Sequence, residues 1–212
     1  MAQRTLAENV ASMLLEVKAV RLNPDRPFKW ASGWNSPIYC DNRITLSYPK
    51  VRSAIKNGLS SAVQAYFADV DIIAGVATAG IAQGALVADW LELPFCYVRP
   101  EPKKHGMGNQ IEGYIKAGQK VVLVEDLVST GGSSLKAVDA LREAGANVLG
   151  MVSIFTYGFE IAKSNFAEKN LKFYSLSDYD TLIGEAVKQK YVSESQLITL
   201  HEWRNNPAEW AV

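Results

Sequence analysis

The segment at residues 121–137 constrains the fold of this chain more than any other feature, and it reads VVLVEDLVSTGGSSLKA. Four apolar residues run into two adjacent acids, Glu125 and Asp126, and then into a turn rich in hydroxyl groups and glycines. This order predicts a buried strand that ends in carboxylates and is followed at once by a loop that opens a helix. A strand, a loop and a helix in this order form the repeating unit of parallel α/β sheets.

The same alternation continues along most of the chain. We expect strands at residues 71–76, 95–98, 120–124, 147–155 and 172–175, and helices between them at 81–91, 133–144 and 159–169. Such alternation predicts an α/β fold with a mostly parallel central sheet flanked by helices. The N-terminal part reads as a helix with Leu6, Val10, Met13, Leu14, Val17 and Val20 on one face, a hairpin at 28–41 and a helix at 47–67. The last part reads as helices at 182–188 and 194–204.

Length and composition bound the class of protein. With 212 residues, the chain is expected to form a single domain, 1–212, in which 1–45 make a small hood of helix and hairpin and 46–212 an α/β core. The net charge of zero predicts no nucleic-acid partner and no anionic membrane surface. No apolar run is long enough to cross a bilayer, and the N-terminus is unlike a signal peptide. Cys40 and Cys96 lack metal or redox spacing, so we expect a cytoplasmic protein.

Ligands of parallel sheets bind beyond the carboxyl ends of the strands, where the loops 77–80, 99–113 and 125–133 are expected to converge. The carboxylates of Glu125 and Asp126 suit the hydroxyls of a ribose or metal-bound water, and both are expected to reach outward at the strand's end. The free amides of a helix start suit a phosphate. The candidate phosphate turn consists of Ser129, Thr130, Gly131, Gly132 and Ser133. The alternative is that Ser133 simply caps a helix, but the whole run favours a site for a phosphorylated ribose.

VVLVEDLVSTGG resembles the ribose-phosphate signature of the type I phosphoribosyltransferases. The segment SGWNSPIYCDNR at 32–43 and the basic loop at 99–106 resemble the orotate-using branch of that family, and the likeness covers most of residues 5–200. The resemblance implies a Mg²⁺-dependent enzyme that transfers the 5-phosphoribosyl group from 5-phosphoribosyl 1-pyrophosphate (PRPP) to orotate, giving orotidine 5′-monophosphate and pyrophosphate. Mg²⁺ would reach the site mainly with the substrate, through water to Glu125 or Asp126, without a metal site of the protein's own.

The loop after residue 98 carries Arg99, Lys103, Lys104 and His105 within seven positions. This density of cations indicates either a lid that neutralises pyrophosphate or an ordinary solvated loop, and the neighbouring signature favours the lid. The resemblance implies that Arg99, Lys103 and His105 bind phosphates. It also implies that Lys103 and His105 act, together with Asp126, as catalytic residues, with the 99–113 loop completing the neighbour's site in a homodimer. Pro100 replaces a lysine of many relatives, and Lys104 is the candidate substitute.

Thr78 lies in the turn Ala77-Thr78-Ala79-Gly80, whose small residues allow backbone amides to approach an anion. The turn resembles the family's pyrophosphate loop without its lysine, and a plain strand–helix turn is an equally good interpretation of this segment alone.

The segment at 32–43 is the candidate base site. Tyr39 is expected to stack on a flat ring and Arg43 to pair with the carboxylate of orotate. The alternative places Tyr39 in the core and Arg43 on the surface. Many relatives carry a lysine at the position of Ala31 and a carboxylate-binding arginine near Tyr157, so the residue that holds the orotate carboxylate is left open.

Two other functions stay open at this point. A purine-salvage phosphoribosyltransferase would use the same donor with another base. A regulator that senses PRPP without turnover would usually carry a DNA-binding module or a basic face, and neither is visible in the sequence.

Overall fold

The computed structural model describes residues 4–30, 33–101 and 110–210. The chain divides into two compact units. The sheet unit comprises Ser53–Leu176, and the terminal unit comprises Met1–Arg52 with Ser177–Val212. Helix α2 (Pro49–Tyr66) and strand β10 (Lys172–Asp178) cross the boundary in sequence. The expected single domain, with a hood at 1–45 and an α/β core at 46–212, stays a prediction.

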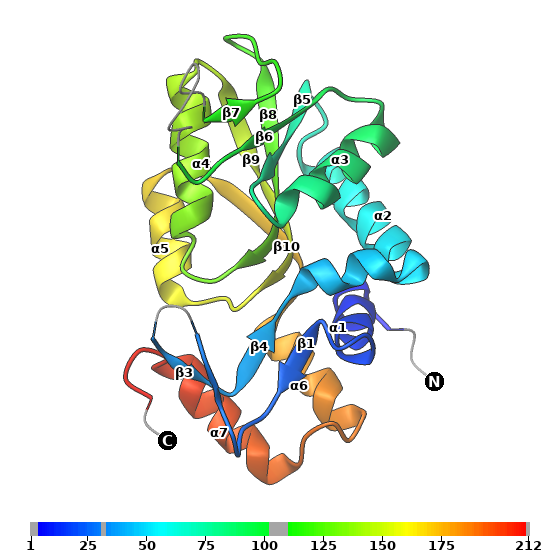
Figure 1. Ribbon diagram of the computed structural model, residues 1–212, viewed down its shortest axis with the longest axis vertical. Coiled ribbons are helices and arrows are strands. Elements are labelled where there is room, and N and C mark those ends of the chain that lie inside the picture. The colour runs from blue at the N-terminus through cyan, green and yellow to red at the C-terminus, as the bar shows by residue number, and fades with distance from the viewer. Residues whose placement is uncertain (1–3, 31–32, 102–109, 211–212) are drawn as a thin grey trace. The chain divides into compact units, whose positions relative to one another are not determined.

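The sheet unit is built on a six-stranded sheet with the strand order β10-β9-β8-β5-β6-β7 (Figure 1). Strands β5 and β6, β5 and β8, and β8 and β9 pair in parallel, whereas β7 runs antiparallel to β6. The remaining bounds are β5 Ile72–Val76, β6 Phe95–Val98, β7 Ile111–Glu112, β8 Lys120–Val128 and β9 Asn147–Thr156. The predicted α/β class with a mostly parallel sheet flanked by helices is therefore confirmed.

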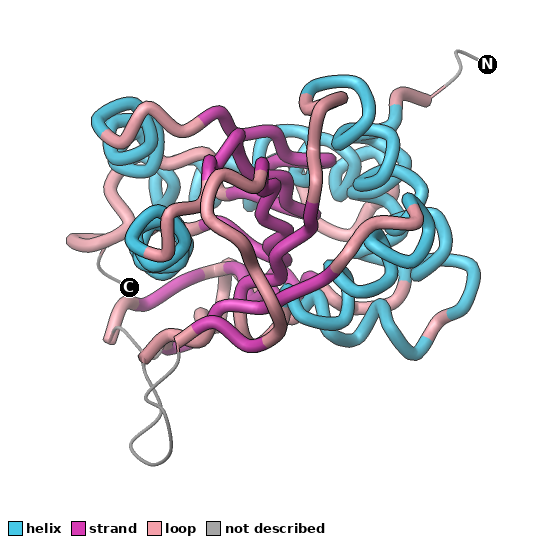
Figure 2. Tube along the Cα trace, turned by 90° about the horizontal axis from the view of Figure 1, so that it is seen from above, coloured by secondary structure: helices cyan, strands magenta, loops and turns pink. Residues whose placement is uncertain are grey.

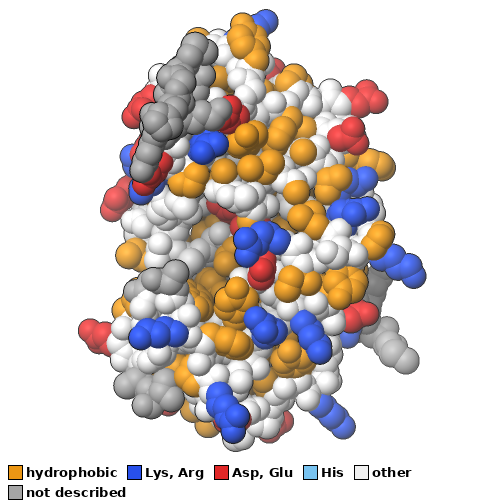
Figure 3. Space-filling model, viewed as in Figure 1, with side chains coloured by type: hydrophobic (Ala, Val, Ile, Leu, Met, Phe, Trp, Pro, Cys, Tyr) orange, Lys and Arg blue, Asp and Glu red, His pale blue; other side chains and the backbone are white. Residues whose placement is uncertain are grey.

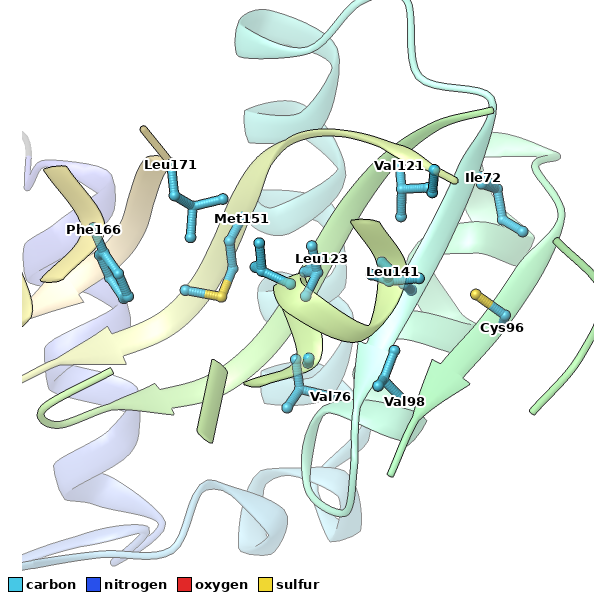
Figure 4. Close-up of a cluster of buried hydrophobic side chains, with 14 of the residues drawn as sticks. Ile72, Val76, Cys96, Val98, Val121, Leu123, Leu141, Met151, Phe166 and Leu171 are labelled. Atoms are coloured by element: carbon cyan, nitrogen blue, oxygen red, sulfur yellow. The ribbon is translucent and has the colours of Figure 1, made fainter. Parts of the chain in front are cut away.

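Helices cover both sides of this sheet. Helix α3 (Gly80–Leu91) lies on one side, and α4 (Gly132–Glu143) and α5 (Glu160–Glu168) lie on the other (Figure 1). Seen from above, the strands twist between these helices (Figure 2). The layer under α4 and α5 is apolar, and Leu123, Leu141 and Met151 lie at its centre (Figure 4). Burial of this layer holds the strand ends in fixed positions relative to the helix that follows β8.

The terminal unit contains three helices and two small antiparallel sheets in its described residues. The helices are α1 (Leu6–Glu16), α6 (Tyr179–Lys188) and α7 (Glu194–Asn205), and the strands are β1 Val20–Leu22, β2 Phe28–Lys29, β3 Asn35–Ser36 and β4 Ile38–Cys40. A 3₁₀ helix, η1 (Asn42–Ser47), leads into α2. No helix among the described residues combines the length and apolar character needed to cross a bilayer.

Two expectations for the N-terminal part need correction. The expected hairpin at 28–41 exists only as the pair β2–β3, because β4 pairs with β1 instead. Val20 does not extend the first helix but opens β1, opposite Cys40. The helix ends at Glu16 with Val17 as its C-cap, and Lys18 has a φ of 58°, which turns the chain out of the helical path before Val20.

Candidate functional site

The acid pair lies inside β8 rather than after it. The predicted strand end at Val124 is wrong, because β8 continues to Val128 in register with β9, with Glu125 opposite Ser153. Successive side chains of a strand point to opposite faces, so the two acids meet different surroundings. Glu125 is only 5% exposed, whereas Asp126 is half-buried. Asp126 is therefore the carboxylate of the pair that a ligand reaches more easily.

Both oxygens of the Glu125 carboxylate are held by the protein. The Asp126 amide donates to Oε1 at 3.0 Å, and the Ser134 hydroxyl donates to Oε2 at 3.2 Å. Burial is the main cause that raises the pKa of Glu125 well above its usual value, and the neighbouring Asp126 charge raises it further. Glu125 is thus a fixed, buried group that underlies the accessible Asp126.

The glycine-rich turn opens α4 with free amides. The N-cap is Gly131, with a φ of 81°, and no side chain of the described residues caps the helix. Ser133, which the alternative interpretation made the cap, lies within the helix and is exposed. A helix start without a side-chain cap leaves amide donors for an anion, as a phosphate site requires.

Helix α5 supports this turn from the core side. Asn165 Nδ2 donates to the Thr130 carbonyl at 3.1 Å. A Cβ added to Gly131 would come within 2.6 Å of Cε1 of Phe166, so the turn is packed against that ring. A Cβ on Gly132 would meet only Thr130 Oγ1, at 3.9 Å. The open side of the turn is therefore at Gly132 and Ser133.

The turn containing Thr78 lies beside the acid pair. The Ala77 amide donates to the Val98 carbonyl at 2.9 Å, and the peptide bond between Ala77 and Thr78 is cis. At Gly80, an added Cβ would press on the Val124 carbonyl oxygen and would come within 3.4 Å of the Glu125 Cα. The structure thus brings the turn with the exposed Thr78 next to the carboxyl-terminal part of β8, which carries the acids.

Arg99 follows β6 at the base of the basic loop. Its backbone amide donates to the Gln110 carbonyl at 2.9 Å, and Gln110 Nε2 donates to the Arg99 carbonyl at 3.0 Å. Arg99 Nη1 lies 3.7 Å from Glu112 Oε1, a loose ion pair in which the arginine side chain stays 41% exposed. Lys103, Lys104 and His105 lie outside the described residues, so their predicted roles stay predictions.

Tyr39 and Arg43, the candidate base-binding residues, belong to the terminal unit, and both contact other residues of that unit. The Arg21 guanidinium lies 4.9 Å from the centroid of the half-buried Tyr39 ring. Arg43 forms a bidentate pair with Asp41, with Nε at 2.7 Å from Oδ1 and Nη2 at 2.9 Å from Oδ2. This pairing lowers the pKa of Asp41. The roles of Tyr39 and Arg43 in binding orotate stay predictions, and Arg43 would have to share its guanidinium with Asp41.

Tyr157 is a core residue. It is 2% exposed, and its ring lies 5.5 Å from both Phe155 and Phe159, measured between centroids. This packing between aromatic rings explains why a tyrosine is buried at this position, so a contact with a ligand is not needed to explain it.

Ser134 is the residue of this site that sequence reasoning missed. It is 1% exposed and lies on the buried face of α4 with Ala137, Val138 and Leu141. A serine in an otherwise apolar stripe, one turn into a helix that follows an acid pair, is the signal that points to it.

The charges on the surface drawn in Figure 3 are scattered. Lys and Arg side chains are interspersed with Asp and Glu, without one continuous basic patch on that face. In the described residues, no group of three or more His, Cys, Asp or Glu side chains is arranged to hold a metal ion.

In comparisons with known proteins, the matching family, the relatives in sequence and the similar solved structures agree with one another. Residues 45–206 match the family described as Phosphoribosyl transferase domain. An orotate phosphoribosyltransferase of Cytophaga hutchinsonii is 59% identical over 203 residues, covering 96% of this chain and 97% of the relative. One of Porphyromonas gingivalis is 54% identical over 209 residues, covering 99% and 100%. The crystal structure of orotate phosphoribosyltransferase from Aeropyrum pernix superposes with a TM-score of 0.75 at 30% identity, covering 87% of this chain and 99% of that one.

Proposed function

Because this chain belongs to the orotate phosphoribosyltransferase family, we propose that it transfers the 5-phosphoribosyl group of PRPP to orotate. The products are orotidine 5′-monophosphate and pyrophosphate, a step of pyrimidine nucleotide synthesis. The observation that carries this proposal is the meeting of Asp126, the uncapped start of α4 and the Thr78 turn at the carboxyl ends of the neighbouring strands β8 and β5. Carboxylate, amide donors and a second anion-binding turn match a ribose that carries a phosphate and a pyrophosphate.

In the reaction, the bond between the anomeric carbon and the pyrophosphate oxygen breaks, and a bond to the base nitrogen forms. Positive charge develops on the ribose ring and negative charge on the leaving group. The Asp126 carboxylate holds the ribose hydroxyls and opposes the positive charge, and the amides of residues 131–133 hold the 5′-phosphate. Amides of the Thr78 turn and the Arg99 guanidinium receive the pyrophosphate. Catalysis is then a matter of position and electrostatics, with no covalent nucleophile.

Magnesium fits this site as an ion that arrives with the substrate. Mg²⁺ keeps several waters and binds proteins through one or two carboxylates together with substrate phosphates. The site offers one accessible carboxylate, Asp126, and a buried one, Glu125, which matches that mode of binding better than a cage of protein ligands. When bound, the ion neutralises charge on the pyrophosphate.

We also propose a cytoplasmic homodimer in which the 99–113 loop completes the neighbour's site. Its support is the likeness of the loop sequence to the family, and the reduced thiols of Cys40 and Cys96 suit a reducing compartment. Mixing Lys103→Ala with Asp126→Asn, each of which should lose most of its activity alone, should restore activity in hybrid dimers that carry one intact site. Absence of recovery after verified subunit exchange would count against a shared site.

The decisive experiment for the reaction is pyrophosphate release from PRPP and Mg²⁺ with orotate, hypoxanthine, xanthine or adenine as the base. Among the four bases, we expect turnover only with orotate. For Asp126→Asn we expect kcat/KM to fall about 10²–10³-fold, as for removal of an electrostatic partner of the transition state. The matched control is Asp89→Asn, an exposed acid on α3, which should retain full activity. Turnover with a purine base, or PRPP binding without turnover, would refute the orotate assignment.

A further inference from the structure

The Ser134 hydroxyl is directed at the acid pair rather than at solvent. Ser134 stands in the first turn of α4, is 1% exposed, and donates to Glu125 Oε2 at 3.2 Å. The other members of this helix face, Ala137, Val138 and Leu141, are apolar and pack into the core. An apolar residue at position 134 would suit the same face, and it would leave one oxygen of a buried carboxylate without this donor.

Glu125 links Ser134 to Asp126, because each of its carboxylate oxygens accepts a hydrogen bond from one of them. The pairing of β5 with β8 ends at Gly75 and Val124, one residue before Glu125. Beyond that point the Asp126 amide donates at 3.0 Å to Glu125 Oε1. Ser134, the Glu125 carboxylate and the Asp126 backbone thus form one hydrogen-bonded chain, which runs from the helix to the residue that a ligand can reach.

Fixing a carboxylate at both oxygens restricts its rotamers and the backbone that it binds. A buried glutamate with only one donor can turn about its side-chain torsions, and the Asp126 amide would then lose its partner in part of the molecules. At Asp126 the strand β8 is still paired with β9 but no longer with β5, so the glutamate contact helps to hold the Asp126 backbone where β5 has ended.

We propose that Ser134 is a positioning residue of the PRPP site: through Glu125 it holds Asp126 in the orientation that binds the ribose hydroxyls. The inference rests on the proposed function for the identity of the ligand. It assigns to α4 a second task beside phosphate binding, because the residue that follows the open turn also orders the carboxylates. Asp126 makes the contact with the sugar, and Ser134 acts only through the buried glutamate.

The test compares Ser134→Ala with Ser134→Thr, which keeps the hydroxyl, and with Ser60→Ala as the matched control. Ser60 is likewise a 1% exposed helical serine of the sheet unit, and its Oγ has no hydrogen-bond partner among the described residues. The dissociation constant of PRPP is measured by calorimetry in the presence of Mg²⁺, and kcat and both KM values by pyrophosphate release.

We expect Ser134→Ala to raise the dissociation constant and the KM of PRPP about five- to tenfold, the effect of one lost hydrogen bond of ordinary strength. The KM of orotate should stay within about twofold, and Ser134→Thr should restore most of the PRPP affinity. A purely structural role would lower thermal stability and leave the two KM values in their wild-type ratio. PRPP affinity in Ser134→Ala equal to that of Ser60→Ala overturns the proposal.

A double-mutant cycle checks that the effect passes through Glu125. In the Glu125→Gln background, Ser134→Ala should change the PRPP dissociation constant by less than about twofold, since the contact to be lost is already altered. If Ser134→Ala does not fold, Ser134→Cys, with a weaker donor of similar shape, takes its place with the same expected direction. A wild-type chain that binds PRPP but does not turn over orotate refutes the orotate assignment, while the calorimetry still decides the role of Ser134. A wild-type chain that binds no PRPP refutes both.

Discussion

The adjacent glycines at the start of α4 serve different purposes, and alanine substitutions separate them. Gly131 has a φ of 81°, and its added Cβ would lie 2.6 Å from Cε1 and 2.9 Å from Cζ of Phe166. Gly132 has no such conformation, and its added Cβ would meet only Thr130 Oγ1, at 3.9 Å. Gly131→Ala should therefore damage the fold, whereas Gly132→Ala should damage only the binding of the 5′-phosphate.

The cost of Gly131→Ala has two parts. The left-handed conformation costs an alanine about 1–2 kcal/mol relative to glycine. Displacing the Phe166 ring from its packed position adds about 1–3 kcal/mol, the usual range for overpacking. The sum is about 2–5 kcal/mol, and for a chain of this length each kcal/mol lowers Tm by about 2–4 °C. Gly132→Ala replaces glycine within a helix, which changes stability by about 0.5–1 kcal/mol in the favourable direction.

Thermal unfolding followed by circular dichroism gives Tm, and calorimetry gives the affinity for PRPP. We expect Gly131→Ala to lower Tm by at least about 4 °C. We expect Gly132→Ala to keep or slightly raise the wild-type Tm while its KM for PRPP rises, because the methyl group enters the open side of the turn. In a Phe166→Leu background, the penalty of Gly131→Ala should shrink, since a smaller side chain relieves the overlap. A Gly131→Ala protein within 1 °C of the wild-type Tm, measured in replicate, would refute the packing argument.

Three further outcomes concern Gly80, Glu8 and the magnesium ion. Gly80→Ala should lower Tm, since its Cβ would press on the Val124 carbonyl oxygen, and it should weaken PRPP binding measured by calorimetry. Contacts with Lys188 and Thr5 lower the pKa of Glu8 to about 2, so the stability that Glu8 contributes is complete above its unfolded pKa of 4.5 and is lost as the pH falls toward 2. Acid unfolding of Glu8→Gln should lack this component, and a curve identical to that of the wild type would contradict it. Chelation with EDTA should abolish pyrophosphate release, and added Mg²⁺ should restore it; full turnover in EDTA would refute the need for the ion.

The periodic parts of the fold could be predicted from the sequence. Alternation of short apolar runs with amphipathic segments fixes a parallel α/β sheet, because each crossover needs a helix to cover the face of the sheet. Strands β5 and β6 and helix α3 therefore lie within a residue of their expected positions. These elements bury continuous apolar faces, and the sequence pattern records that burial directly.

The ends of elements depended on tertiary neighbours that the pattern does not record. The apolar run of β8 stops at Val124, but the strand continues to Val128 because β9 offers partners for Glu125, Leu127 and Val128. Val20 fits a helical stripe as well as a strand, and only its pairing with Cys40 decides between them. Local propensity yields to such pairings wherever a second strand is available.

For the site, the sequence predicted that the acid pair, the glycine-rich turn and the Thr78 turn converge beyond the carboxyl ends of the strands, but it did not reveal how unequal the two acids are. Adjacent residues of a strand face opposite sides, and that rule alone separates Glu125 from Asp126 once the strand is known to extend past them. One side is the core layer under α4, so Glu125 is buried there; the other leaves Asp126 half-exposed.

Burying a carboxylate beneath a binding site costs free energy unless hydrogen-bond donors hold it. Here the donors come from the two elements whose relative position determines the geometry of the site. Ser134 belongs to the helix that presents the phosphate-binding amides, and the Asp126 amide belongs to the strand that presents the carboxylate. The free amides at the start of α4 also favour negative charge close to them. Glu125 therefore ties the position of α4 to that of β8 at the place where both meet the ligand. This coupling gives the buried second acid a structural task, and its expected contact with the ribose hydroxyls stays a prediction.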